Sequence, residues 1–288
     1  MNLLKELEVA INASLKAGEI LMRYFSEKNY DIKYKSKSGR GSPVTSADVE
    51  SNEILRDKIL SVFPNDGWLS EETVDDMSRL EKQRVWIVDP LDGTNDFLKG
   101  VPEFAVSVAL VELNKPVLGV VYNPATKELY FGVKGNGSYL LRDYVEEGLR
   151  FDSLDEYRNY LIKLGSSIES FDKISIIVSR KEMEKVDFIK DLVEVFGVAK
   201  FRESIAYKIV SVAGGWADAV VSVFNKSEWD LAGAHLIAEE AGLKVTDSYG
   251  EKIFYNQINV RKSGVIVASD KLHDKILSFI KGTEKGKS

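Results

Sequence analysis

The sequence predicts an N-terminal α+β half followed by a C-terminal α/β half. Three observations predict this order: apolar residues recur at helical spacing near the N-terminus, alternating apolar and polar residues then predict a run of strands, and strands alternate with helices after that. We therefore expect an N-terminal domain over 1–172 and a C-terminal domain over 173–288.

Two helices open the N-terminal half. Leucine and isoleucine recur at helical spacing from Leu4 to Leu15 and predict a first helix over 3–27. Residues 33–43 are rich in Lys, Ser and Gly, and this composition is typical of a surface loop. A second helix should begin after Thr45 and end near Phe63.

The next segments predict an antiparallel sheet. The alternation in FAVSVALVEL and the turn in KGNGSY favour strands joined in sequence order as a meander. The predicted strands are 85–88, 104–113, 116–122 and 129–133. Segment 142–172 is highly charged and weakly periodic, so we interpret it as an inserted, helix-containing connection between the domains.

Strands and helices alternate in the C-terminal half. We expect strands over 174–179, 219–224 and 263–269, and helices over 181–197, 204–217, 231–242 and 270–282. The order β-α-α-β-α-β is typical of an α/β unit.

Composition excludes several classes of function. The net charge of -6, from 45 acidic and 39 basic residues, argues against a binder of nucleic-acid polymers. With no Cys, the chain has no disulfides, thiolate nucleophiles or Cys-ligated zinc, and its two His make a histidine-rich zinc site unfavourable. No apolar run approaches the roughly 20 residues of a membrane span, and MNLLKELEVA lacks a signal-peptide core, so we expect a cytoplasmic protein without a membrane partner.

Three acidic segments predict a magnesium site. Glu71 lies in WLSEET, Asp89 and Asp92 lie in WIVDPLDGTNDF, and Asp230 lies in EWDLAGA. Carboxylates are hard oxygen donors of the kind that Mg²⁺ prefers, and the carbonyl of Leu91 is a further oxygen between two of them.

The residues after Asp92 are suited to phosphate. Gly93 permits close backbone approach, and N–H groups near Thr94 would point outward if a helix begins there. Each signal also has a structural explanation. Asp-Gly is a strong turn dipeptide, and Asp48 forms a capping box with Thr45. Glu71 could lie in a solvated loop and Asp230 could cap a helix.

The segments GSPVTSADVESN, WLSEET, WIVDPLDGTNDF and WDLAGAHLIAEEAG together resemble the inositol monophosphatase superfamily, over roughly residues 10–275. That superfamily holds inositol monophosphatases, 3′(2′),5′-bisphosphate nucleotidases and some fructose-1,6-bisphosphatases. The resemblance implies a layered α-β-α-β-α sandwich of the sugar-phosphatase type and a homodimer. It also implies hydrolysis of a small phosphate ester with two or three Mg²⁺ ions, and inhibition by Li⁺.

The resemblance also assigns roles. The metal ligands would be Glu71, Asp89, the Leu91 carbonyl, Asp92 and Asp230, most of them in the N-terminal domain. The catalytic set would be Asp48, Thr94 and Glu71, with Thr94, supported by Asp48, orienting the attacking water. The backbone around Gly93 and Thr94 would hold the phosphate.

Substrate residues are predicted in the C-terminal half. Arg180 and Lys208 would suit a second phosphate, as in a nucleotidase, although ordinary solvation also explains them, and Ser204 is expected in the same binding set. Inositol monophosphatases carry a substrate-contacting Glu near the place of Ser222 and Val223 here. We expect a phosphomonoesterase for a phosphorylated polyol such as inositol monophosphate, with the nucleotidase and then the fructose-1,6-bisphosphatase as alternatives.

Three other readings remain open. Haloacid-dehalogenase phosphatases also have an Asp cluster followed by Gly-Thr, so they are one alternative. Their Asp residues are two apart, whereas Asp89 and Asp92 are three apart, and this difference argues against that family. A regulatory binding protein could retain the fold without catalysis, and the acidic residues could hold structural Ca²⁺.

Overall fold

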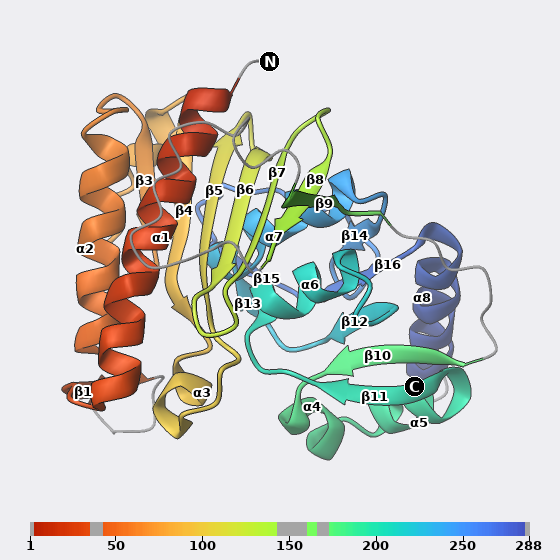
Figure 1. Cartoon of the computed structure of the whole chain (residues 1–288). Helices are drawn as coiled ribbons and strands as arrows, with labels where there is room; N and C mark the ends of the chain where they lie inside the picture. Colours follow the sequence, from red (N-terminus) through yellow and green to blue (C-terminus); the bar gives the residue numbers. More distant parts are fainter. Residues whose placement is uncertain (1–2, 35–42, 143–159, 166–172, 286–288) are drawn as a thin grey trace.

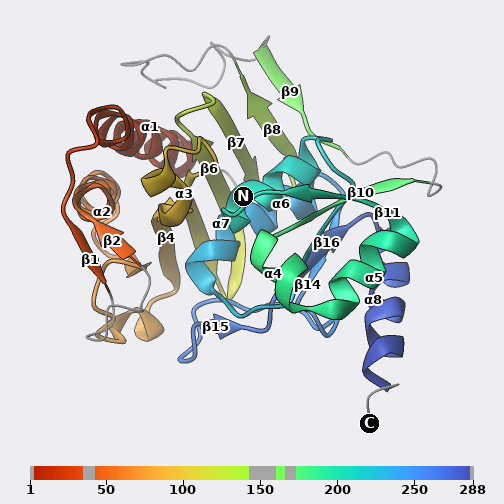
Figure 2. The same ribbon diagram turned by 90° about the horizontal axis from the view of Figure 1, so that it is seen from below.

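The chain folds into five alternating layers of helices and sheets (Figures 1 and 2). The computed structural model describes residues 3–34, 43–142, 160–165 and 173–285. A helix pair covers one face of a large sheet, two helices separate that sheet from a smaller one, and further helices cover the outer face of the smaller sheet. The predicted α-β-α-β-α sandwich is confirmed.

The first layer contains α1 (Leu4–Glu27) and α2 (Ser46–Leu60), close to their predicted positions. The capping box starts α2, since the N–H of Asp48 donates to Thr45 Oγ1 and the N–H of Thr45 donates to Asp48 Oδ2 at 2.7 Å. A short hairpin of β1 (Ile32–Tyr34) and β2 (Pro43–Thr45) stands at the ends of the predicted loop, and 35–42 lie outside the described residues.

The second layer is a seven-stranded sheet in the order β3-β4-β5-β6-β7-β8-β9. Its strands are β3 (Gly67–Ser70), β4 (Arg84–Asp92), β5 (Ala105–Glu112), β6 (Lys115–Asn123), β7 (Glu128–Val133), β8 (Ser138–Leu141) and β9 (Leu161–Lys163). From β4 onward every neighbouring pair is antiparallel, which confirms the predicted meander. The pair β3–β4 is parallel.

The predicted helical connection over 142–172 needs a correction where it is described. Residues Leu161–Lys163 pair with β8 as the last strand of the large sheet, because their backbone completes its open edge. Residues 143–159 and 166–172 lie outside the described part of the chain.

The fourth layer is a five-stranded sheet in the order β11-β10-β12-β16-β14. Its strands are β10 (Ile174–Val178), β11 (Gly197–Phe201), β12 (Ala219–Ser222), β14 (Lys244–Thr246) and β16 (Val265–Ala268). A two-residue pair, β13 (Lys226–Ser227) with β15 (Arg261–Lys262), lies apart from it.

The predicted helix over 181–197 is wrong as one element. The chain forms α4 (Arg180–Lys185) and α5 (Asp187–Phe196), separated by Val186 in an extended conformation. Strand β11 then begins at Gly197, where a side chain would lie 2.0 Å from the carbonyl oxygen of Ile174. Parallel pairing with β10 therefore outweighs continuation of the helix.

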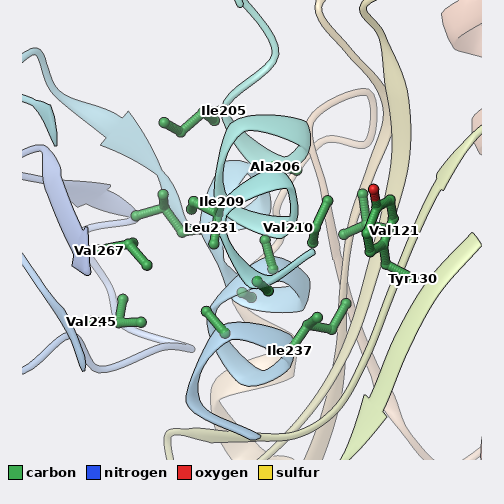
Figure 3. Packing of buried hydrophobic residues seen from close by; sticks show 14 of the residues in the cluster. Val121, Tyr130, Ile205, Ala206, Ile209, Val210, Leu231, Ile237, Val245 and Val267 are labelled. Carbon is green, nitrogen blue, oxygen red and sulfur yellow. The ribbon is translucent and has the colours of Figure 1, made fainter. Parts of the chain in front are cut away.

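The middle layer consists of α6 (Ile205–Ala213) and α7 (Glu228–Glu240). Figure 3 shows Val210 and Ile237 facing the large sheet, while Val245 and Val267 lie on the side of the smaller one. Helix α7 approaches the large sheet closely, because a Cβ on Gly119 would lie 2.2 Å from the carbonyl oxygen of Gly233.

The outer layer contains α5 and α8 (Asp270–Lys285), as Figure 2 shows. Their apolar side chains pack on the smaller sheet. Within the described residues, none of the helices combines the length and apolar character that a bilayer span requires. The domain boundary near residue 172 stays a prediction, since the core between the two sheets draws residues from both halves.

Candidate metal and phosphate site

Three predicted carboxylates converge at one end of the middle layer. Glu71 follows β3, Asp89 lies in β4, and Asp230 lies in the first turn of α7. One oxygen of each lies within 4.8 Å of an oxygen of the other two. Parallel pairing of β3 with β4 brings Glu71 beside Asp89, because the N–H of Glu71 donates to the carbonyl of Val88 at 3.3 Å.

Asp92 stands next to this trio and is held from the C-terminal half. The pairing of β4 with β5 becomes irregular between Asp89 and Asp92. Asp92 Oδ2 accepts hydrogen bonds from Ser204 Oγ at 2.6 Å and from the N–H of Ala206 at 2.7 Å. The start of α6 therefore fixes the orientation of this carboxylate.

Electrostatics in the cluster favour a bound cation. Burial and the neighbouring carboxylates raise the pKa of Asp89 well above its ordinary value. Burial raises the pKa of Asp92 to about 6, against hydrogen bonds from Ser204 and Ala206 that lower it. Burial, then Asp92 and Glu71, raises the pKa of Asp230 to about 7. Like charges this close, two of them buried and two partly buried, need compensation, and an all-oxygen donor set suits a hard divalent cation such as Mg²⁺.

Thr94 connects the cluster to Asp48. Its Oγ1 lies 3.1 Å from Asp48 Oδ1 and 3.1 Å from the carbonyl oxygen of Leu91. The hydroxyl of Thr45 fixes the other oxygen of Asp48, donating to Oδ2 at 2.6 Å. Burial raises the pKa of Asp48, against the hydrogen bonds from Thr45 and Thr94 that lower it.

Gly93 makes the turn between β4 and α3 (Thr94–Lys99). Its φ of 98° lies in the left-handed region, and a Cβ there would lie 2.9 Å from the carbonyl oxygen of Glu103. Only glycine fits both constraints. Gly93 and Thr94 are both partly exposed beside Asp92.

The predicted substrate residues fall into different environments. The side chain of Arg180 is 59% exposed and pairs with Glu203 at 3.4 Å. Lys208 is 1% exposed. Burial lowers its pKa to about 8, although the negative charges of Glu182 and Asp92 raise it. Ser204 lies at the cluster, but its hydroxyl donates to Asp92. The substrate contacts of all three stay predictions.

Glu182 is a buried carboxylate, bonded to the segment after β12, that the sequence analysis did not single out. It is buried, and its Oε1 accepts from Ser222 Oγ at 2.7 Å, from the N–H of Val223 at 2.8 Å and from the N–H of Phe224 at 3.2 Å. It therefore fixes the segment around Ser222 and Val223. This is the place where the resemblance to inositol monophosphatases would put a substrate-contacting Glu. The Ser179-x-x-Glu182 spacing, a capping box in the structure, was the available signal.

Comparisons with known proteins find similar proteins over most of the chain's length. A family model described as the inositol monophosphatase family matches residues 2–282. The fructose-1,6-bisphosphatase/inositol-1-monophosphatase of Aquifex aeolicus is 32% identical over 282 residues, covering 97% of each chain. The 3′(2′),5′-bisphosphate nucleotidase CysQ of Haemophilus influenzae is 29% identical over 244 residues, covering 84% of each. The crystal structure of CysQ from Bacteroides thetaiotaomicron superposes with a TM-score of 0.76 at 32% identity, covering 92% of this chain and 97% of the other.

Proposed function

The chain belongs to the inositol monophosphatase family, a family of phosphatases, and from this premise we propose that it is a Mg²⁺-dependent phosphomonoesterase for a small phosphorylated polyol such as inositol monophosphate. The convergence of Glu71, Asp89 and Asp230 carries the proposal. The proposed ligands are those three carboxylates, the Leu91 carbonyl and Asp92. Mg²⁺ held there would offset the negative charge of the ester and lower the pKa of a water molecule for attack.

Thr94 and Asp48 are the proposed orienting pair. Thr94 has one hydroxyl proton, and donating it to Asp48 Oδ1 leaves its oxygen able to accept a proton of the attacking water. The water is thereby turned so that a lone pair faces the phosphorus. Asp48 cannot swing away, because Thr45 bonds its other oxygen. Backbone N–H groups at Gly93 and Thr94 are the proposed phosphate contacts.

Two observations favour a monophosphate over a bisphosphate. Lys208 is one of two candidate partners of a second phosphate. It is buried, and the negative charge of Glu182 already balances its positive charge. The other, Arg180, already pairs with Glu203. The likeness to a protein named 3′(2′),5′-bisphosphate nucleotidase makes that activity the second candidate, and the fructose-1,6-bisphosphatase activity the third.

A substrate panel tests the proposal. Inositol 1-phosphate, 3′-phosphoadenosine 5′-phosphate and fructose 1,6-bisphosphate are each incubated with Mg²⁺, with and without Li⁺, and released phosphate is measured. We expect the highest kcat/KM for the inositol ester, inhibition by Li⁺, and loss of turnover in Asp92→Asn with the fold retained.

A higher kcat/KM for the bisphosphorylated nucleotide would transfer the proposal to the nucleotidase. Absence of Mg²⁺-dependent phosphate release from all three esters would favour a regulatory binding protein. A homodimer and a cytoplasmic location are part of the same proposal, and sedimentation of the purified protein tests the first of them.

A further inference from the structure

Arg79 is an almost completely buried arginine outside the carboxylate cluster. It lies in the short helix η1 (Ser78–Glu81), and its side chain is 1% exposed. A buried guanidinium needs acceptors for its donors. Asp75 accepts from Nε at 3.1 Å and from Nη2 at 2.8 Å, so one side of the fork is bound within the loop after Glu71.

The other side of the fork reaches a segment far along the chain. Nη1 donates to Asn256 Oδ1 at 2.7 Å, and Nη2 donates to the carbonyl oxygen of Gln257 at 3.0 Å. Asn256 has a φ of 54°, a left-handed conformation that Asn tolerates better than most residues. Arg79 thus joins the loop after β3 to the loop before β15.

The contact continues from there to the start of α7. The N–H groups of Asn256 and Gln257 donate to Glu228 Oε2 at 2.6 Å and to Glu228 Oε1 at 3.0 Å. Glu228 is fully buried and also pairs with Lys262 Nζ at 2.9 Å. It is the first residue of α7, two residues before Asp230.

Arg79 is also packed against the strand that carries Glu71 to the cluster. A Cβ on Gly67, the first residue of β3, would lie 3.1 Å from the Cβ of Arg79. Strand β3 ends at Ser70, directly before Glu71. One side chain therefore contacts β3 and, through two backbone amides and Glu228, the first turn of α7.

We propose that Arg79 is a positioning residue for metal binding, which holds Glu71 and Asp230 at the separation that a shared cation needs. The inference rests on the proposed function. Two like-charged carboxylates repel each other, so the segments that carry them would separate without an opposing contact. The clamp of Asp75, Arg79, Asn256, Gln257 and Glu228 opposes that separation before the cation arrives.

Binding of Mn²⁺ alone tests the clamp without catalysis. Free Mn²⁺ is measured by electron paramagnetic resonance, and thermal unfolding is recorded for each variant. Loss of a group that supports metal ligands typically weakens metal affinity by about 10–100-fold, and we expect that loss for Arg79→Gln. Arg79→Lys should recover little of it, because an ammonium cannot reproduce the planar fork.

Arg84→Gln is the matched control. Arg84 is also tied to acids, Glu6 at 2.9 Å and Asp66 at 3.1 Å, but it begins β4, at the end opposite the cluster. The Arg84→Gln substitution should lower the unfolding temperature and leave Mn²⁺ affinity unchanged. Asp75→Asn, at a 21% exposed position, removes the carboxylate that pairs with Arg79 and serves if Arg79→Gln does not fold.

Two results overturn the clamp and leave the proposed function standing. One is Mn²⁺ affinity equal to wild type in folded Arg79→Gln or, if that variant does not fold, in Asp75→Asn. The other is an equal loss of affinity in Arg84→Gln, which would reduce Arg79 to a general stabiliser. A wild-type protein that binds no Mn²⁺ would contradict the proposed function itself, and the clamp with it.

Discussion

Replacing Asp230 with Asn should stabilise the metal-free protein while removing its response to Mg²⁺. Burial, Asp92 and Glu71 raise the pKa of Asp230 from an ordinary 3.8 to about 7. At about 1.4 kcal/mol per pKa unit, ionising this partly exposed carboxyl costs up to about 4 kcal/mol of folding free energy, less where solvent screens it. Asn retains an oxygen that can accept from the N–H of Ser227, now bonded to Asp230 Oδ2 at 2.7 Å, so the helix cap survives.

The sign of the pH dependence follows from the raised pKa. Wild-type protein has its full stability below the ordinary pKa of the Asp230 carboxyl, where this group is protonated in both the folded and the unfolded state. That contribution to stability is lost as pH rises through about 7. Urea unfolding with a chelator should therefore show Asp230→Asn more stable than wild type at about pH 8, by up to about 4 kcal/mol, with the gap narrowing as pH falls and closing only below about pH 4. Saturating Mg²⁺ should reverse the order, because only wild type gains the full binding free energy. A variant that is less stable than wild type at about pH 8 without metal would refute the reasoning.

Three further predictions concern the surroundings of the cluster. Ser204→Ala removes the hydroxyl that orients Asp92 and should lower Mg²⁺ affinity or kcat by about 10–100-fold, whereas Ser14→Ala, which removes a buried hydroxyl bonded to the carbonyl of Ala10, should leave both unchanged in the same assay. Gly119→Ala forces α7 away from the large sheet, so calorimetry should show a loss of about 1–3 kcal/mol and titration a weaker affinity for Mg²⁺; unchanged values for both would contradict the close approach. Lys208→Ala and Arg180→Ala should raise KM for a bisphosphorylated nucleotide only if the nucleotidase alternative holds, and equal effects on inositol phosphate would exclude that alternative.

The elements with strong local signals could be predicted from the sequence. The capping box at Thr45 and the alternation in FAVSVALVEL depend on neighbours in the chain, so α2 and the meander lie close to their predicted positions. The convergence of Glu71, Asp89 and Asp230 was expected because their chemistry implies a shared cation, and because the segments resemble a known family.

The remainder depends on contacts between distant segments. The sequence of 181–197 has helical periodicity throughout, but the edge of β10 takes up Gly197 and the residues after it as a strand. From the sequence alone, Lys208 is expected to be an exposed lysine. It is buried because α6 packs between the two sheets. Arg79 and Glu228 give no local sign that they are joined through residues 256–257, so the clamp could not be predicted.

The position of Asp230 in α7 has a consequence for synthesis of the protein. A ribosome makes Glu71 and Asp89 early, but the helix that completes the cluster emerges only after most of the chain has been translated. In the folded protein, helix α7 packs between the two sheets. A nascent or truncated chain that lacks α7 therefore lacks Asp230, so the cluster of Glu71, Asp89 and Asp230 is incomplete until this late segment has been made.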